Sequence, residues 1–158
     1  MLETYKKFCK EHQGCELIKI DGHFFINSNE SVIIKDDELT SDGHFPVIFN
    51  IVTNDFICSD CKKLTSLEGA PKIVDYFDCS GCDNLISLIG APQTVRTFYC
   101  SFCVRLMSLE GAPQNGDIFR CKKCPNINYL EKTITRTRLW FNSIKNSYKA
   151  LFLWTSKQ

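Results

Sequence analysis

One sequence unit occurs three times in this chain without insertions, and a fourth copy is incomplete. The unit reads Phe-x-Cys-x-x-Cys-x-x-Leu-x-x-Leu-x-Gly-Ala-Pro and starts at Phe56, Phe77 and Phe98, which gives a 21-residue period. The fourth copy starts at Phe119 and has Lys-Thr-Ile at 132–134 in place of Gly-Ala-Pro. Self-similarity at a fixed period of this length is typical of stacked repeats, because one unit alone cannot bury its apolar face.

The internal spacing of the unit predicts the shape of one rung. The phenylalanine and the first cysteine stand two positions apart, so in a strand both point to one face. If that face is inward, the two leucines fill the interior on the return path. The glycine supplies a positive φ, and the proline ends regular hydrogen bonding at a corner. Stacked rungs then place their strands in a parallel sheet at a spacing of roughly 4.8 Å.

The predicted fold is therefore a repeat solenoid with a parallel sheet of 21-residue rungs and loose, non-helical back segments. All 158 residues are expected to form a single domain. We assign residues 54–131 to the regular repeats and residues 1–53 to an N-terminal cap that includes one irregular rung. Residues 132–158 are assigned to a degenerate last rung and a C-terminal cap. Terminal repeats that depart from the pattern are typical of solenoids, because they shield the outermost rungs from water.

The N-terminal cap is predicted to contain a helix and a β-hairpin. Apolar side chains recur at helical spacing over residues 2–12, which predicts a short amphipathic helix. Two apolar runs, 17–20 and 23–26, flank Asp21-Gly22. Two such runs around an Asp-Gly dipeptide are typical of a hairpin.

The C-terminal segment is both aromatic and basic. We expect a strand near 138–142 and a helix from about 143 to 155, which together form a helical and aromatic cap on the last rung. Residues 128–158 contain six Lys/Arg and one Asp/Glu, whereas residues 1–57 contain five and ten, within a net charge of +1. This asymmetry indicates either the solvated face of a cap or a site for an anionic partner.

The unit resembles the leucine-rich repeat, L-x-x-L-x-L-x-x-N/C-x-L, with phenylalanine and cysteine at the two strand positions. It is most similar to a leucine-rich-repeat-like family of tailed-phage and bacterial proteins in which Phe-x-Cys-Ser and Ser-Leu-Glu-Gly-Ala-Pro units recur. Cys58-Ser59 and the segments 66–71 and 108–113 carry these units here, whereas the segment 87–92 departs from them at Ile89. The resemblance implies a binding scaffold of phage or bacterial origin, without an activity to transfer.

The cysteines of the repeats form four Cys-x-x-Cys pairs at regular intervals, and their spacing also matches a zinc signature. Zinc would not require the phenylalanines, leucines, glycines and prolines to follow the same period. Free cysteine is a common small buried side chain, and a reducing compartment disfavours disulfides. We expect a ladder of buried thiols and no cofactor. The alternative is a set of zinc ligands drawn from Cys58, Cys61, Cys79, Cys82, Cys100, Cys103, Cys121 and Cys124.

Signatures of catalysis are absent from the sequence. The three histidines, His12, His23 and His44, are scattered through the N-terminal third, and neither a glycine-rich phosphate loop nor a His-Glu-x-x-His motif occurs. A structural role for each histidine is favoured over the activation of a cysteine nucleophile. We therefore expect that the protein is not an enzyme.

The strand positions predicted to point outward vary from copy to copy, whereas the inward positions hardly vary. An exposed sheet face that carries tyrosine, phenylalanine and arginine is typical of protein–protein interfaces. A shallow surface also suits a protein partner better than a small molecule, which needs a concave pocket. We therefore predict a protein-interaction module. Its candidate binding residues are Tyr76, Asp78, Tyr99, Phe102, Ile118, Arg120, Lys123 and Phe141.

The family resemblance implies a host protein as the partner, which a phage protein would inhibit or redirect. Met1–Lys7 lacks the apolar stretch of a secretory signal, and no apolar run reaches the ~18 residues of a membrane span. We expect a cytoplasmic protein, in the host cytoplasm if it is phage-encoded. The alternative function is a zinc-stabilised nucleic-acid-binding protein that uses the Cys-x-x-Cys pairs and the basic C-terminus.

Overall fold

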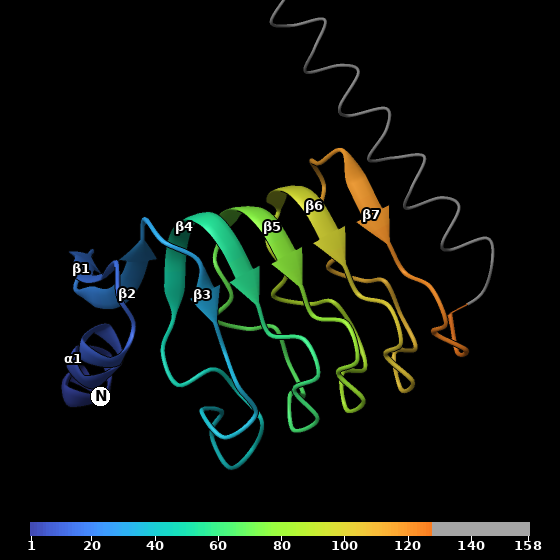
Figure 1. The fold of residues 1–158 in the computed structure, drawn as a ribbon, viewed down its shortest axis with the longest axis horizontal. Coiled ribbons are helices and arrows are strands. Elements are labelled where there is room, and N and C mark those ends of the chain that lie inside the picture. The colour runs from blue at the N-terminus through green and yellow to red at the C-terminus, as the bar shows by residue number, and fades with distance from the viewer. Residues whose placement is uncertain (128–158) are drawn as a thin grey trace, which may run out of the picture.

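The computed structural model describes residues 1–127, which form a β-solenoid with a parallel sheet and one N-terminal helix (Figure 1). The solenoid, its parallel sheet and the N-terminal helix confirm the sequence-based expectation. The predicted strand near 138–142, the predicted helix at 143–155 and the candidate residue Phe141 lie outside the described residues. The elements are α1 (Leu2–Glu11), β1 (Cys15–Ile20), β2 (His23–Ser28), β3 (Val32–Ile33), β4 (Phe49–Ile57), β5 (Ile73–Asp78), β6 (Thr94–Tyr99) and β7 (Ile118–Arg120).

One sheet runs through the described residues in the order β1-β2-β4-β5-β6-β7, and β3 pairs with the far end of β4. The strands from β4 to β7 are parallel and point the same way in Figure 1, with the return segments looping out below them. The β1–β2 pair is antiparallel and turns at Asp21 and Gly22, between the paired residues Ile20 and His23. Within residues 1–127, no helix has the length and apolar character that crossing a membrane requires.

The register between neighbouring strands follows the phenylalanines. Phe77 pairs with Phe56 on one side and with Phe98 on the other, and Phe98 pairs with Phe119. Each phenylalanine is thus paired with the equivalent residue of the next copy of the unit. At the start of β4, Val52 pairs with Val74, one position beyond the repeat period, and the register shifts before Asp55. One extra residue of β4 is therefore accommodated as a bulge, which lets the phenylalanine column begin in register.

The core is a column of stacked phenylalanine rings lined by leucines and cysteines. The ring centroids of Phe56, Phe77, Phe98 and Phe119 lie 5.4, 5.2 and 5.6 Å apart in succession, with interplanar angles of 3°, 4° and 6°. These separations are those of offset-stacked aromatic pairs. The leucines of the return segments are buried beside this column: Leu64, Leu67, Leu85, Leu88, Leu106 and Leu109.

Helix α1 packs against the N-terminal end of the same core. Tyr5 and Phe8 are its buried residues, and the Phe8 ring meets Phe49 edge to face at 5.3 Å. Phe49 in turn meets Phe56, the first ring of the column, at 4.9 Å. The Tyr5 hydroxyl accepts a hydrogen bond from the backbone N–H of Ile48 at 3.2 Å, which satisfies a polar group at this apolar contact.

The glycines of the second and third Gly-Ala-Pro corners are required by a close approach between successive rungs. Gly90 and Gly111 have φ angles of 89° and 85°, which side chains with a Cβ rarely adopt. A Cβ on Gly90 would collide with the backbone of Glu68, and one on Gly111 with the backbone of Leu88 and Ile89. Because the obstacles are backbone atoms, the corners of neighbouring rungs pack closely only when this residue is glycine.

Replacing Phe98 by alanine is expected to lower the free energy of unfolding by about 3–5 kcal/mol, because the ring is fully buried between two stacked neighbours and its removal leaves a cavity. Urea denaturation followed by circular dichroism measures this change. Ile86, whose side chain is 45% exposed, provides the control, and Ile86→Ala should change stability by less than about 0.5 kcal/mol. Equal losses in the two variants would contradict a core that depends on the ring column.

Candidate functional site

Two columns of side chains form the outward surface of the parallel sheet, which we call the strand face. The first column follows the pairs Asp55–Tyr76, Tyr76–Thr97 and Thr97–Ile118. The second follows Ile57–Asp78, Asp78–Tyr99 and Tyr99–Arg120. The residues between the columns and after them, the phenylalanines and first cysteines, point into the core. The structure thus brings five of the predicted binding residues onto one surface: Tyr76, Asp78, Tyr99, Ile118 and Arg120.

A third column lies at the exit of each strand and has a left-handed backbone. Its members Asp60, Gly81, Phe102 and Lys123 have φ angles of 58°, 73°, 62° and 54°. Glycine adopts this conformation freely, whereas a residue with a Cβ is strained there by about 1–2 kcal/mol. The aromatic member of the column, Phe102, is 51% exposed. The conformation was not predicted from the sequence, although the glycine in this column is a signal for it.

Aromatic and cationic side chains contact one another across the last rungs. The rings of Tyr76 and Tyr99 meet edge to face at 5.3 Å. The Arg120 guanidinium carbon lies 5.7 Å from the centroid of the Tyr99 ring, and the Lys123 Nζ lies 4.8 Å from that of Phe102. Each contact joins one rung to the next, so the aromatic rings of β6 and its exit hold the two cations of the following rung in place.

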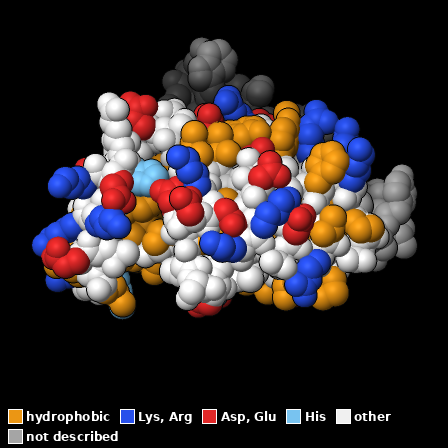
Figure 2. Space-filling model, turned by 60° about the horizontal axis from the view of Figure 1, so that its bottom comes forward, with side chains coloured by type: hydrophobic (Ala, Val, Ile, Leu, Met, Phe, Trp, Pro, Cys, Tyr) orange, Lys and Arg blue, Asp and Glu red, His pale blue; other side chains and the backbone are white. Residues whose placement is uncertain are grey.

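An acidic side chain completes this part of the strand face. The Tyr76 hydroxyl donates a hydrogen bond to Asp78 Oδ2 at 3.3 Å, and Asp78 Oδ1 accepts one from the backbone N–H of Ser80 at 2.8 Å. Burial, followed by the charge of Asp78, raises the pKa of Tyr76 to about 12. The phenol therefore stays protonated and acts as a fixed hydrogen-bond donor at neutral pH. Figure 2 shows hydrophobic, acidic and basic side chains next to one another on the surface it displays.

The cysteines of the repeats lie in or against the core, where thiols donate hydrogen bonds to the backbone. The second cysteine of each rung donates from Sγ to the carbonyl of the first cysteine one rung earlier: Cys82 to Cys58 at 3.1 Å, Cys103 to Cys79 at 3.2 Å and Cys124 to Cys100 at 3.1 Å. Cys61 begins the series by donating to the Ile34 carbonyl at 3.3 Å. A thiol that donates a hydrogen bond is protonated, whereas a zinc ligand is a thiolate.

The pKa values of the thiols agree with their being protonated hydrogen-bond donors. Burial raises the pKa of the Cys61 thiol to about 12, with the neighbouring Cys82 as the next cause. Burial also raises the pKa of Cys58 and Cys79 well above the usual value. Within residues 1–127, no group of three or more His, Cys, Asp or Glu side chains has the arrangement of a metal site. The eight candidate zinc ligands therefore give the zinc hypothesis no geometric support.

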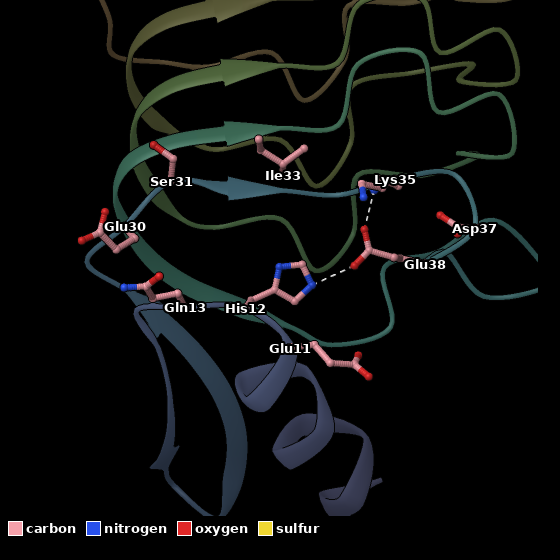
Figure 3. A pocket seen from close by; sticks show the side chains of 9 residues that line it. All are labelled: Glu11, His12, Gln13, Glu30, Ser31, Ile33, Lys35, Asp37 and Glu38. Carbon is pink, nitrogen blue, oxygen red and sulfur yellow. Dashed lines mark hydrogen bonds and ion pairs between the residues drawn. The ribbon is translucent and has the colours of Figure 1, made fainter.

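A second candidate site is an open cleft of about 750 Å³ between the end of α1 and the segment 30–38 (Figure 3). His12 Nε2 lies 2.7 Å from Glu38 Oε1, and Glu38 Oε2 accepts a hydrogen bond from the backbone N–H of Lys35 at 2.7 Å. The His12 ring also stacks on Phe8 with centroids 3.9 Å apart. Sequence reasoning missed the His12–Glu38 pair, because its members are far apart in the sequence and no local pattern connects them.

Four of the nine residues that line this cleft are acidic, namely Glu11, Glu30, Asp37 and Glu38. The contact between His12 and Glu38 joins the end of α1 to the segment 30–38 and therefore helps to stabilise the fold.

Comparisons with protein-family models, curated proteins and solved structures found no match to this chain. The two candidate sites are therefore judged on their own chemistry.

Alkylation of the native protein should separate the thiols by burial. Iodoacetamide at neutral pH is expected to modify Cys9 and Cys15, which are partly exposed, long before the buried cysteines of the repeats, because the reagent must reach a thiolate. Cys121 is also partly exposed but should react slowly, since hydrogen bonds with Cys100 and Cys124 raise the pKa of its thiol. Peptide mapping by mass spectrometry identifies the modified residues, and urea-unfolded protein supplies the full-labelling control. Rapid labelling of the core cysteines only after addition of a chelator would contradict the thiol ladder and indicate bound metal.

Replacing Phe102 by glycine is expected to stabilise the fold by up to about 1 kcal/mol, because it removes the left-handed strain, while the greater freedom of glycine in the unfolded chain offsets part of the gain. Phe102→Ala serves as the control, since its Cβ keeps the strain. Urea denaturation of both variants measures the difference. A glycine variant less stable than the alanine variant would show that the backbone at this position is not strained.

Proposed function

We propose that this protein is a non-enzymatic interaction module that binds a macromolecular partner through the strand face. The carrying observation is that half-buried Tyr76 and Tyr99 and exposed Arg120 lie together on the strand face, with the exposed ring of Phe102 at the exit of β6. Tyrosine and arginine are enriched among the residues that dominate binding energy at protein interfaces. A partner gains more from such side chains when they are already held in place, because less conformational entropy is lost on binding.

The strained backbone and the exposed ring of Phe102 support the same proposal. Residues in left-handed conformations with large side chains persist where the surroundings impose them, and they cluster at functional sites. The equivalent position one rung earlier is Gly81, so the rung itself does not need a side chain there. An aromatic side chain that is half exposed and strains the backbone at this position is best explained by a contact with a partner.

The finer description of the fold is part of this proposal. We assign the 21-residue unit as the rung, residues 1–53 as the N-terminal cap and residues 132–158 as a degenerate rung and C-terminal cap. The pairing of Phe77 with Phe56 and Phe98 supports the assignment of the rung. In line with the resemblance to phage-associated repeat proteins, the proposed partner is a host protein that is inhibited or redirected, and the proposed location is the host cytoplasm.

The proposal is tested by capture from bacterial lysate, followed by calorimetric titration with the purified captured protein. Tyr99→Ala, Phe102→Gly and Arg120→Ala, combined in one variant, are expected to weaken binding at least about 100-fold, since hot-spot truncations each cost about 1–2 kcal/mol or more. The matched control combines Ile86→Ala, Ile89→Ala and Met107→Ala, which remove exposed apolar side chains from the return segments. It should bind within about twofold of the wild type.

Circular dichroism and urea denaturation of both triple variants establish that each is folded. Unchanged affinity of the strand-face variant would overturn the assigned surface. Loss of binding in the control alone would move the interface to the return segments. Equal loss in both folded variants would also count against the strand face as the dominant contact.

A further inference from the structure

Two cations of the solenoid, Lys62 and Arg96, are paired with carboxylates, whereas Lys63 and Lys72 form no ion pair within residues 1–127. Lys62 Nζ lies 3.1 Å from Asp83 and 3.6 Å from Asp60. On the strand side, the Arg96 guanidinium lies 3.3 Å from Asp75. Charges paired in this way offer little net field to a ligand that approaches from solvent.

Four further cations, which lie toward the C-terminal end of the described solenoid, have no such partners among residues 1–127. Within that part of the chain, none of Arg105, Arg120, Lys122 and Lys123 forms an ion pair with a carboxylate. Arg105 donates instead to the neutral Asn84 Oδ1 at 2.8 Å. Like charges that cluster without counter-charges repel one another and disfavour the compact state, so their retention needs a reason.

The aromatic rings position two of these cations rather than neutralise them. Arg120 lies over Tyr99 and Lys123 over Phe102, so the pair of rings in one rung carries the pair of cations in the next. A ring orders a cation but leaves its full charge available to a ligand. Ile118, 41% exposed, and Phe102 add apolar surface beside them. We call Tyr99, Phe102, Ile118, Arg120 and Lys123 the basic–aromatic corner.

We propose that the basic–aromatic corner is the docking site for an acidic polypeptide segment of the partner. Carboxylates of that segment pair with Arg120 and Lys123, and its apolar groups pack on Phe102 and Ile118. This inference rests on the proposed function and adds to it the chemistry and place of the contact. The positive charge of the corner makes an anionic occupant complementary, and the cations held over rings are already ordered for it.

The charges of the neighbouring rungs favour a polypeptide over a nucleic acid. Asp78 stands on the strand face one rung before Tyr99, and Asp55 one rung earlier still in the adjoining column. A nucleic-acid strand carries a charge on every nucleotide and binds along continuous basic grooves. Continued along the strand face, it would meet these carboxylates. A polypeptide can instead concentrate its carboxylates at the corner and place neutral or basic residues beyond it.

Fluorescence anisotropy with defined probes tests the inference. The probes are a labelled peptide of alternating glutamate and serine, the same peptide with glutamine for glutamate, and a labelled oligothymidine. The full-length protein is expected to bind the glutamate peptide, to ignore the glutamine peptide and to lose affinity as salt rises, because the contact is between exposed charges. Tighter binding of oligothymidine than of the glutamate peptide would overturn the choice of a polypeptide.

A charge-matched pair of variants locates the site. Arg120→Gln with Lys123→Gln is expected to weaken the glutamate peptide at least about fivefold. Lys63→Gln with Lys72→Gln removes the same charge elsewhere and also one cation over a ring, since Lys72 Nζ lies 5.6 Å from the centroid of Phe25. This control should change affinity less than about twofold. Equal weakening in both pairs would overturn the corner as a specific site.

The outcome also separates this inference from the proposed function. If the glutamate peptide fails to bind while the strand-face triple variant still loses the captured partner, the partner chemistry is wrong and the interaction module stands. If the peptide binds through Arg120 and Lys123 while the captured partner is insensitive to the triple variant, the acidic site stands and the strand face is not the interface of that partner.

Discussion

The packing of each phenylalanine ring on the ring of the next rung is the constraint on which the rest of this fold depends. Side chains of a strand alternate between faces, so a register slip of one residue would expose Phe77 and turn Tyr76 or Asp78 into the core. The step between rings is therefore fixed, and the extra residue of β4 lies before the ring column begins, between Val52 and Asp55. The close approach at Gly90 and Gly111 holds the opposite corner at the same step.

Because the inward columns are fixed so tightly, the side chains that vary on the strand side lie in the outward columns and in the left-handed column at the strand exits. The first two can change side chain without disturbing the ring contacts. The third changes at an additional cost, since every residue except glycine is strained there. Phe102 and Lys123 occupy this column in successive rungs, and within residues 1–127 neither Lys123 nor Arg120 forms an ion pair with a carboxylate.

The sequence was sufficient to predict the solenoid, the parallel sheet and the helix at 2–11, because periodic apolar positions report directly on what is buried. The spacing of Phe56 and Cys58 predicted that they share one face, and their full burial shows that this face is the inward one. The left-handed exits and the bulge of β4 depend instead on how a rung meets its neighbour, which no single copy encodes. The His12–Glu38 pair was not predicted from the sequence for a related reason, since it forms only after the chain has folded back on α1. Five of the eight candidate binding residues were brought onto one surface by the same periodicity, but the pairing of charges depended on three-dimensional contacts.

The two ends of such a stack are not equivalent. A parallel solenoid built from rungs alone would present complementary surfaces at its ends, and one molecule could continue the stack of another to form a filament. Here the ring column ends against α1, where Phe8 meets Phe49 edge to face instead of offering another stacked ring. The sheet at the same end reverses direction in the β1–β2 pair. At its N-terminal end the ring column therefore offers no further parallel ring on which the column of a second molecule could stack.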